Sequence, residues 1–137
     1  SNKSDLASRT IKIAKRNIPY WWAAYHGLHR STAVANILPV PMLPFGEKEF
    51  SVDLVWLVKM SLQGEFITSD KLLLKKKYLD ESLSATWAHN SINKLALWIA
   101  ILNEFRLAQI PSVDKLHLWR DVLSLAVEKI KLRTPFT

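Results

Sequence analysis

The run Leu95-Ala-Leu-Trp-Ile-Ala-Ile-Leu102 is the longest uninterrupted stretch of apolar residues in the chain. Such a run is apolar on every side of a helix, so it is expected to be enclosed by other elements rather than to lie on a surface. Its flanks carry helix-forming residues such as Lys94, Glu104 and Arg106, and the segment 83–109 has no proline or glycine. That segment is far longer than a typical strand. We therefore expect a buried central helix, and the run is well short of the roughly 20 residues that cross a bilayer, so no transmembrane segment is expected.

The composition indicates one folded domain without disulfides. Of the 137 residues, 49% are hydrophobic and 23% are charged, which is typical of a globular protein, and one core can serve this length. We expect residues 1–137 to form a single helical domain. Three glycines supply few positions with positive φ, which argues against a β-sandwich or a barrel. The absence of cysteine excludes disulfides, thiolate metal sites and a cysteine nucleophile.

Capping residues, helix breakers and apolar spacing predict further helices on both sides of the central one. Gly27 and Gly64 are expected to end two of them, and Pro111 is expected to precede the last. Three prolines between Pro39 and Pro44 forbid a helix there and favour an extended connector that packs against the domain. The fold class is therefore all-α, a single compact bundle of five to seven helices around a buried central helix. The expected helices span residues 4–17, 19–26, 31–38, 47 or 51 to 63, 68 or 69 to 79, and 112–133. A further long helix is expected to begin at residue 80, 82 or 84 and to run to 109 with a break near 89–91.

The formal net charge of +7 is concentrated in two parts of the chain. Residues 1–46 hold six basic and one acidic residue, and residues 71–79 hold four lysines and no acidic residue. A basic excess of this kind favours polyanionic partners such as nucleic acid, anionic lipid or an acidic protein surface. Ordinary solvated helix faces are the alternative interpretation. The first cluster contains Arg9, Lys12, Lys15 and Arg16, and the second contains Lys71, Lys75, Lys76 and Lys77.

The window from Thr68 to Leu97 has the proportions of a helix-turn-helix, with a basic helix, a break and a second helix that begins with polar residues. Asparagine side chains can form hydrogen bonds with base edges, so Asn90 and Asn93 are candidates for readout, together with Thr86 and His89. The leading hypothesis is a non-enzymatic basic domain that binds DNA or RNA. The two basic clusters would contact the phosphates.

The alternative hypothesis is a helical protein–protein interaction module or a small subunit of a larger assembly. The last expected helix carries two apolar faces, of which the broader is expected to face the core and the narrower to face a partner. This module could form a homo-oligomer or a hetero-oligomer through the C-terminal helix, or bind an acidic protein surface. The broader face comprises Leu116, Trp119, Val122, Leu123, Ala126, Val127 and Ile130, and the narrower comprises Leu118, Leu125 and Leu132.

No sequence motif indicates catalysis or a bound cofactor. Glycine-rich phosphate loops, nucleophile elbows and zinc-protease motifs are absent from the sequence. His26 and His29 are three residues apart and could supply two metal ligands, but no third ligand is nearby. We therefore expect no enzyme activity, no metal and no cofactor. The polar N-terminus predicts no signal peptide and favours a cytoplasmic or nucleic-acid-containing compartment, while a removed leader stays open because the chain begins with Ser1.

Overall fold

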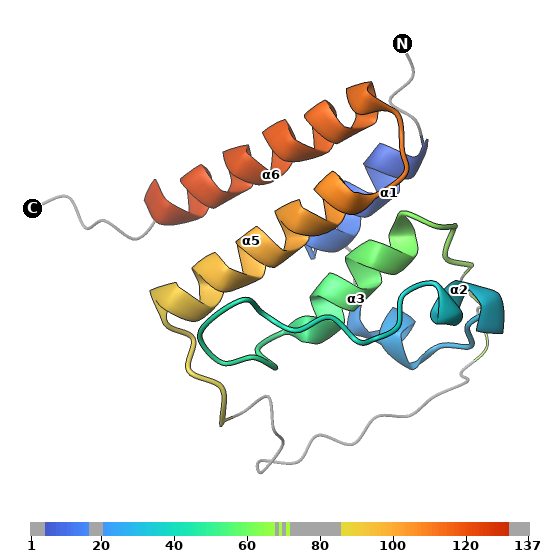
Figure 1. The fold of residues 1–137 in the computed structure, drawn as a ribbon, viewed down its shortest axis with the longest axis horizontal. Coiled ribbons are helices and arrows are strands. Elements are labelled where there is room, and N and C mark those ends of the chain that lie inside the picture. The colour runs from blue at the N-terminus through green and yellow to red at the C-terminus, as the bar shows by residue number, and fades with distance from the viewer. Residues whose placement is uncertain (1–4, 17–20, 68, 70, 72–85, 132–137) are drawn as a thin grey trace, which may run out of the picture.

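The computed structural model describes residues 5–16, 21–67, 69, 71 and 86–131, and within these ranges the chain is helical and contains no strand (Figure 1). The expectation of an all-α fold is confirmed. The predicted helix over 68–79 lies almost entirely outside the described residues. The helices are α1 (Asp5–Ala14), α2 (Ser31–Ala35), α3 (Val52–Ser61), α5 (Ser91–Leu107) and α6 (Ser112–Lys131), with the 3-10 helix η1 (Trp21–His26) between α1 and α2.

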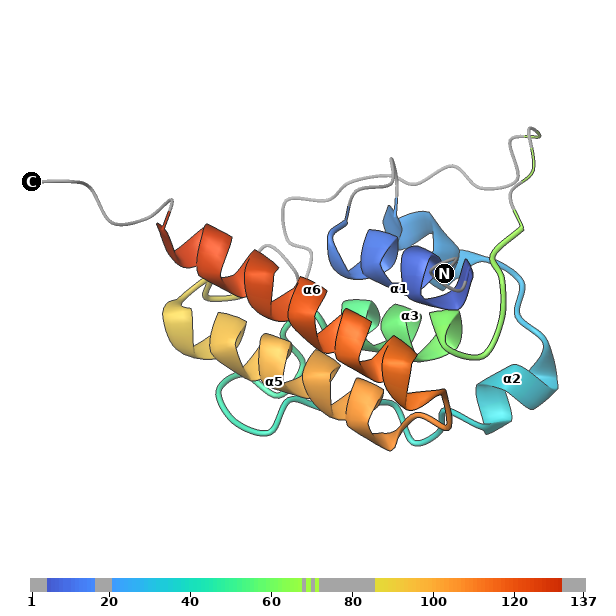
Figure 2. The same cartoon turned by 90° about the horizontal axis from the view of Figure 1, so that it is seen from above.

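The four longer helices pack in a ring around a common core. α1 packs against α3 and α6, and α5 packs against the same two helices, while η1 lies against α3. Figures 1 and 2 show α5 and α6 side by side along most of their lengths. The largest fully buried side chains come from α3, α5, α6 and the segment between α2 and α3, and include Phe50, Leu57, Phe105, Leu118 and Val122.

The helix most enclosed by the rest of the chain is α3, not the helix that carries Leu95–Leu102. Seven of the ten residues of α3 are buried. In α5 the buried residues lie on one side, while Leu95 is 56% and Ile99 is 41% exposed. The expectation that the whole run is enclosed is therefore wrong in the described part of the chain. The length of an apolar run indicates that a helix has apolar residues on every side. Which of these sides is buried depends on where the other helices pack.

Local sequence signals explain where the two long helices begin. The side chain of Asn90 accepts a hydrogen bond from the backbone N–H of Asn93 at 2.8 Å, which caps the N-terminus of α5. The break expected near residues 89–91 is thus the start of this helix. α6 begins at Ser112, directly after Pro111. The predicted boundary there is confirmed, since a proline is tolerated before a helix but not inside one.

The proline-rich segment after α2 is irregular and packs onto the bundle, as expected. Leu43 is buried, and its N–H donates to the carbonyl of Lys48 at 2.9 Å. Gly46 has a φ of +71°, a conformation that glycine adopts without strain. These contacts hold residues 41–44 across the front of α3 and beside α5 (Figure 1). Within the described residues, none of the helices has the length and hydropathy needed to span a membrane.

Candidate interaction surface

The N-terminal basic cluster is only partly available to a ligand. Lys12 on α1 and Lys15, directly after this helix, are exposed. Arg9, however, donates from Nε to the carbonyl of Ser61 at 2.7 Å and so ties α1 to the end of α3. Partial burial lowers the pKa of the Arg16 guanidinium, and the nearby carboxylate of Asp53 opposes this shift. Two of the four predicted phosphate contacts therefore already have partners inside the protein.

The second basic cluster is represented in the described residues by Lys71 alone, which is exposed. Lys75, Lys76 and Lys77 lie outside the described residues. The convergence of the two basic clusters on one positive surface thus stays a prediction.

Asn93 has a structural role that contradicts its assignment to base readout, whereas the assignment of Asn90, which is exposed, stays a prediction. Asn93 is 2% exposed. Its Oδ1 accepts the N–H of Glu47 at 2.9 Å, and its Nδ2 donates to the carbonyl of Ala88 at 2.8 Å. The Asn90 side chain is used in capping α5. Polar side chains near the start of a helix can form hydrogen bonds with backbone groups instead of with a ligand, and these two side chains do so.

The bundle covers residues of both apolar faces of α6, whereas the broader face alone was expected to face the core. Leu118 of the predicted interface stripe is fully buried, Leu125 is half-buried, and Leu132 lies outside the described residues. Val122 of the broader face is also buried, but Leu116 is 71% and Leu123 is 48% exposed. The assignment of Leu118 to an interface is therefore wrong. Periodicity identifies apolar faces on a helix and does not tell which of them the bundle covers.

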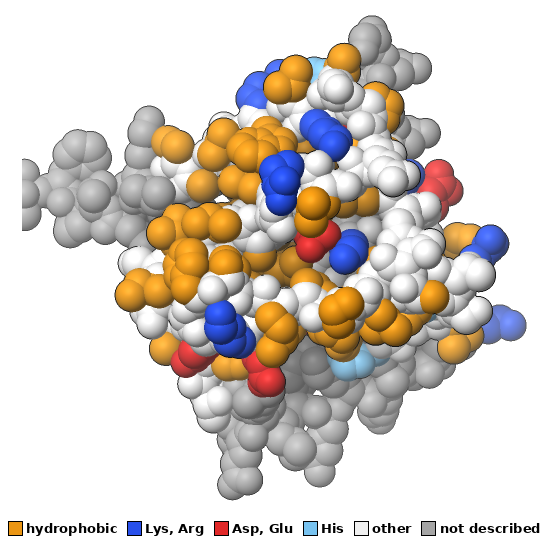
Figure 3. Space-filling model, viewed as in Figure 1, with side chains coloured by type: hydrophobic (Ala, Val, Ile, Leu, Met, Phe, Trp, Pro, Cys, Tyr) orange, Lys and Arg blue, Asp and Glu red, His pale blue; other side chains and the backbone are white. Residues whose placement is uncertain are grey.

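An exposed apolar surface covers the outer sides of α5 and α6, and we call it the α5–α6 apolar surface. Its residues recur at spacings of three, four or seven, so on each helix they share one side. In Figure 3 hydrophobic side chains gather on this face of the molecule, over the two helices. The surface comprises Ile92, Leu95 and Ile99 of α5 and Val113, Leu116, Trp119, Leu123 and Val127 of α6, each between 37% and 71% exposed.

The part of α5 and α6 that carries this surface has no net charge, unlike the whole chain. Between Ser91 and Glu128 there are four basic residues and four acidic ones, and Lys129 and Lys131 at the end of α6 give the two helices together a net charge of +2. Arg120 emerges on the outer side of α6, but its guanidinium forms an ion pair with Asp121 at 3.0 Å. The α5–α6 apolar surface is therefore close to neutral. Between Ser91 and Glu128 the basic residues are Lys94, Arg106, Lys115 and Arg120, and the acidic residues are Glu104, Asp114, Asp121 and Glu128.

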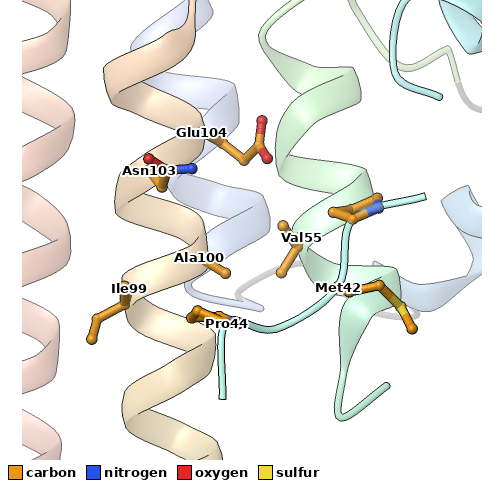
Figure 4. A pocket seen from close by; sticks show the side chains of 8 residues that line it. Met42, Pro44, Val55, Ile99, Ala100, Asn103 and Glu104 are labelled. Carbon is orange, nitrogen blue, oxygen red and sulfur yellow. The ribbon is translucent and has the colours of Figure 1, made fainter. Parts of the chain in front are cut away.

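A groove of about 340 Å³ adjoins this surface (Figure 4). It lies between α5, α3 and the proline-rich segment, and Ile99 belongs both to the groove and to the α5–α6 apolar surface. Its walls are apolar, and its polar residues are Asn103 and Glu104. The apolar lining consists of Pro41, Met42, Pro44, Val55, Ile99 and Ala100.

Glu104 is the carboxylate of the groove, and its side chain is 12% exposed. Burial raises the pKa of Glu104 above its usual value, and the ammonium group of Lys59, 3.7 Å from Oε2, opposes this shift. In Figure 4 the carboxylate lies between α5 and α3, above Pro44 and Val55. No pattern in the sequence singles out this residue, because the groove forms only when three separate segments pack together.

The two histidines considered as metal ligands lie near η1. His29 packs edge-on against Trp56, with ring centroids 4.7 Å apart, and its Nε2 lies 3.3 Å from the carbonyl oxygen of Tyr25. Across the described residues, no group of three or more His, Cys, Asp or Glu side chains is placed to hold a metal ion. Comparison of the chain with protein-family models, curated proteins and solved structures finds no match.

Proposed function

We propose that the protein is a non-enzymatic helical interaction module that pairs with a second copy of itself through the α5–α6 apolar surface. The observation that carries the proposal is the position of Leu116, Leu123 and Val127, which point away from the core although water is an unfavourable environment for them. Scattered exposed leucines are ordinary in proteins, but a contiguous apolar face on two adjacent helices is typical of an interface.

The size of the surface fits a dimer contact. Eight large side chains, each about half exposed, present on the order of 700 Å² if a fully accessible one presents about 150 to 200 Å². The largest apolar patch of a typical monomer covers about 300 to 600 Å². A standard interface takes about 800 Å² from each partner. The α5–α6 apolar surface therefore supplies most of the area that each copy contributes to a standard interface.

The charge balance favours a second copy as the occupant. A chain of net charge +7 would repel itself if its basic residues lay in the contact. Here most of the excess lies in the N-terminal part and in residues 71–79, while the stretch from Ser91 to Glu128, which contains every residue of the surface, has no net charge. In a two-fold contact the same patch meets itself, so a neutral apolar patch is compatible with its own copy.

Size-exclusion chromatography with light scattering tests the proposal. The wild-type protein should have twice its chain mass of 15.7 kDa. The double variant Leu123→Asp, Val127→Asp should have the single-chain mass, because two carboxylates would be buried in an apolar contact. Ile67→Asp is the matched control, since Ile67 is 93% exposed outside this surface. A wild-type monomer at about 0.5 mM, a concentration at which even a Kd near 0.1 mM gives mostly dimer, would contradict the proposal, as would a dimer unaffected by the double variant.

Nucleic-acid binding is the second candidate, and the exposed positions of Lys12 and Lys15 favour it. Both lie in the part of the chain where basic residues exceed acidic ones. Fluorescence anisotropy with duplex and single-stranded oligonucleotides at low salt would test it. Binding should fall steeply with added salt and should weaken in Lys12→Glu, Lys15→Glu but not in the control Lys48→Glu. Equal binding by both variants would exclude this candidate.

A further inference from the structure

The groove beside α5 combines a long apolar wall with a single carboxylate. Met42 and Pro44 come from the proline-rich segment, Val55 comes from α3, and Ile99 and Ala100 come from α5. Glu104 follows Ala100 by one helical turn, so its carboxylate stands beyond the apolar wall on the same helix (Figure 4). A ligand that fits this arrangement is apolar along its length and positively charged at one end.

The ion pair that Glu104 already forms leaves the carboxylate able to accept another donor. The distance of 3.7 Å from the Lys59 nitrogen to Oε2 is longer than the about 2.7 to 2.9 Å of a charge-assisted hydrogen bond. A carboxylate has about four acceptor positions, and one distant ammonium group does not fill them. The side chain of Lys59 is 29% exposed, so it can turn toward solvent when a second cation arrives.

We propose that this groove binds a small aliphatic amine or guanidine, with its cation on Glu104 and its alkyl chain along Met42, Pro44 and Ile99. The volume of about 340 Å³ is at the lower end of the range for small-molecule sites, which suits a short unbranched chain. The carboxylate of Glu104 is complementary to the charge of a cationic ligand, although the protein as a whole is basic. The inference does not depend on self-association, because the groove is built within one chain.

Titration of ¹⁵N-labelled protein with n-pentylamine, followed through the backbone amides of residues 99–105, tests the proposal. Pentylamine should shift these amides, while 1-pentanol and pentanoate, which share its chain length, should bind at least about tenfold more weakly. The titration is repeated on Leu123→Asp, Val127→Asp, so that a groove covered by a second copy is distinguished from a groove that does not bind. Equal affinity for the amine and the alcohol would overturn the proposal.

Substitutions in the groove test separately where the cation and the alkyl chain of the ligand bind. Glu104→Gln should weaken pentylamine binding at least about tenfold, whereas Glu128→Gln, on the exposed part of α6, should leave it unchanged. Met42→Ala removes part of the wall at a position 54% exposed, so folding should be retained. It should weaken pentylamine while leaving methylamine unaffected. Titration with a blocked lysine amide shows whether the groove also accepts a lysine side chain in place of a free amine. Pentylamine binding that persists in Glu104→Gln would contradict the assignment of the cation to Glu104.

Discussion

At the residue scale, Asn93 connects three parts of the chain. Its amide joins Glu47 before α3 to Ala88 before α5, and the carboxylate of Glu47 in turn lies 3.3 Å from the N–H of Ala88. Gly46 is fitted to the same place, because a Cβ there would fall onto Oδ1 of Asn93. The asparagine that the sequence nominated for base recognition is therefore a buried connector. Without it, the N–H of Glu47 would lose its partner, and the carbonyl of Ala88 would keep only the N–H of Asn90.

Asn93→Ala should destabilise the protein by about 2 to 3 kcal/mol, because it removes two hydrogen bonds worth about 1 kcal/mol each and truncates a buried side chain. Asn90→Ala removes only the cap of α5 and should cost about 1 kcal/mol. Urea unfolding followed by circular dichroism measures both. Equal losses for the two variants would show that the connections made by Asn93 do not matter to the fold.

Glu104 should make stability depend on pH. Burial raises the pKa of Glu104 in the folded state, so the folded protein holds this proton more tightly than the unfolded chain does. The contribution is therefore favourable at low pH and is lost as pH rises from the unfolded pKa through the folded one. Glu104→Gln, which resembles the protonated carboxyl, should gain stability relative to wild type as the pH rises above the usual pKa of a glutamate, about 4.3. Glu128→Gln is the control, and a gain of equal size there would exclude burial of Glu104 as the cause.

At the scale of elements, α6 has an inner and an outer apolar side, and two leucines on it provide a matched comparison. Leu118 is fully buried and Leu123 is 48% exposed. Leu118→Ala should cost about 2 to 5 kcal/mol, because it leaves a cavity in the core. Leu123→Ala should change the stability of the monomer by less than about 1 kcal/mol and should weaken self-association instead. Unfolding of the two variants in a Leu116→Asp, Val127→Asp background, which should be monomeric, and in wild type separates these effects. The reverse order would mean that α6 is rotated.

The sequence predicts where these helices lie better than it predicts which way they face. Pro111 and the polar residues before Ser91 mark helix starts because caps and breakers act within a few residues. The orientation of α6 depends on its packing against α5 and against α1, which is distant in sequence, and both faces of α6 are apolar. The same reason accounts for the exposed Leu95 in a run expected to be enclosed. The groove at Glu104 depends on three segments at once, and no local pattern in the sequence announces it.

At the scale of the whole molecule, charge and apolar surface are separated, so the two candidate functions respond differently to salt. Contact between apolar surfaces is not screened by ions, so the dimer should persist from about 0.1 M to about 1 M sodium chloride. Phosphate contacts by Lys12 and Lys15 would be lost over that range because binding releases counterions from the nucleic acid. Sedimentation velocity at several salt concentrations measures whether the dimer persists. Dissociation of the dimer by salt would place ion pairs, not leucines, in the contact.

The most direct test of the central claim is a distance between two copies. The chain contains no cysteine, so Ser124→Cys gives one spin label per copy on the exposed side of α6. Packed helices lie about 8 to 10 Å apart, so double electron–electron resonance should show a defined separation under about 30 Å between labels. Gln63→Cys, beyond the end of α3, should show a longer one. A label at Ser124 that reports no neighbouring copy, or no shorter distance than the label at Gln63, would contradict pairing through the α5–α6 apolar surface.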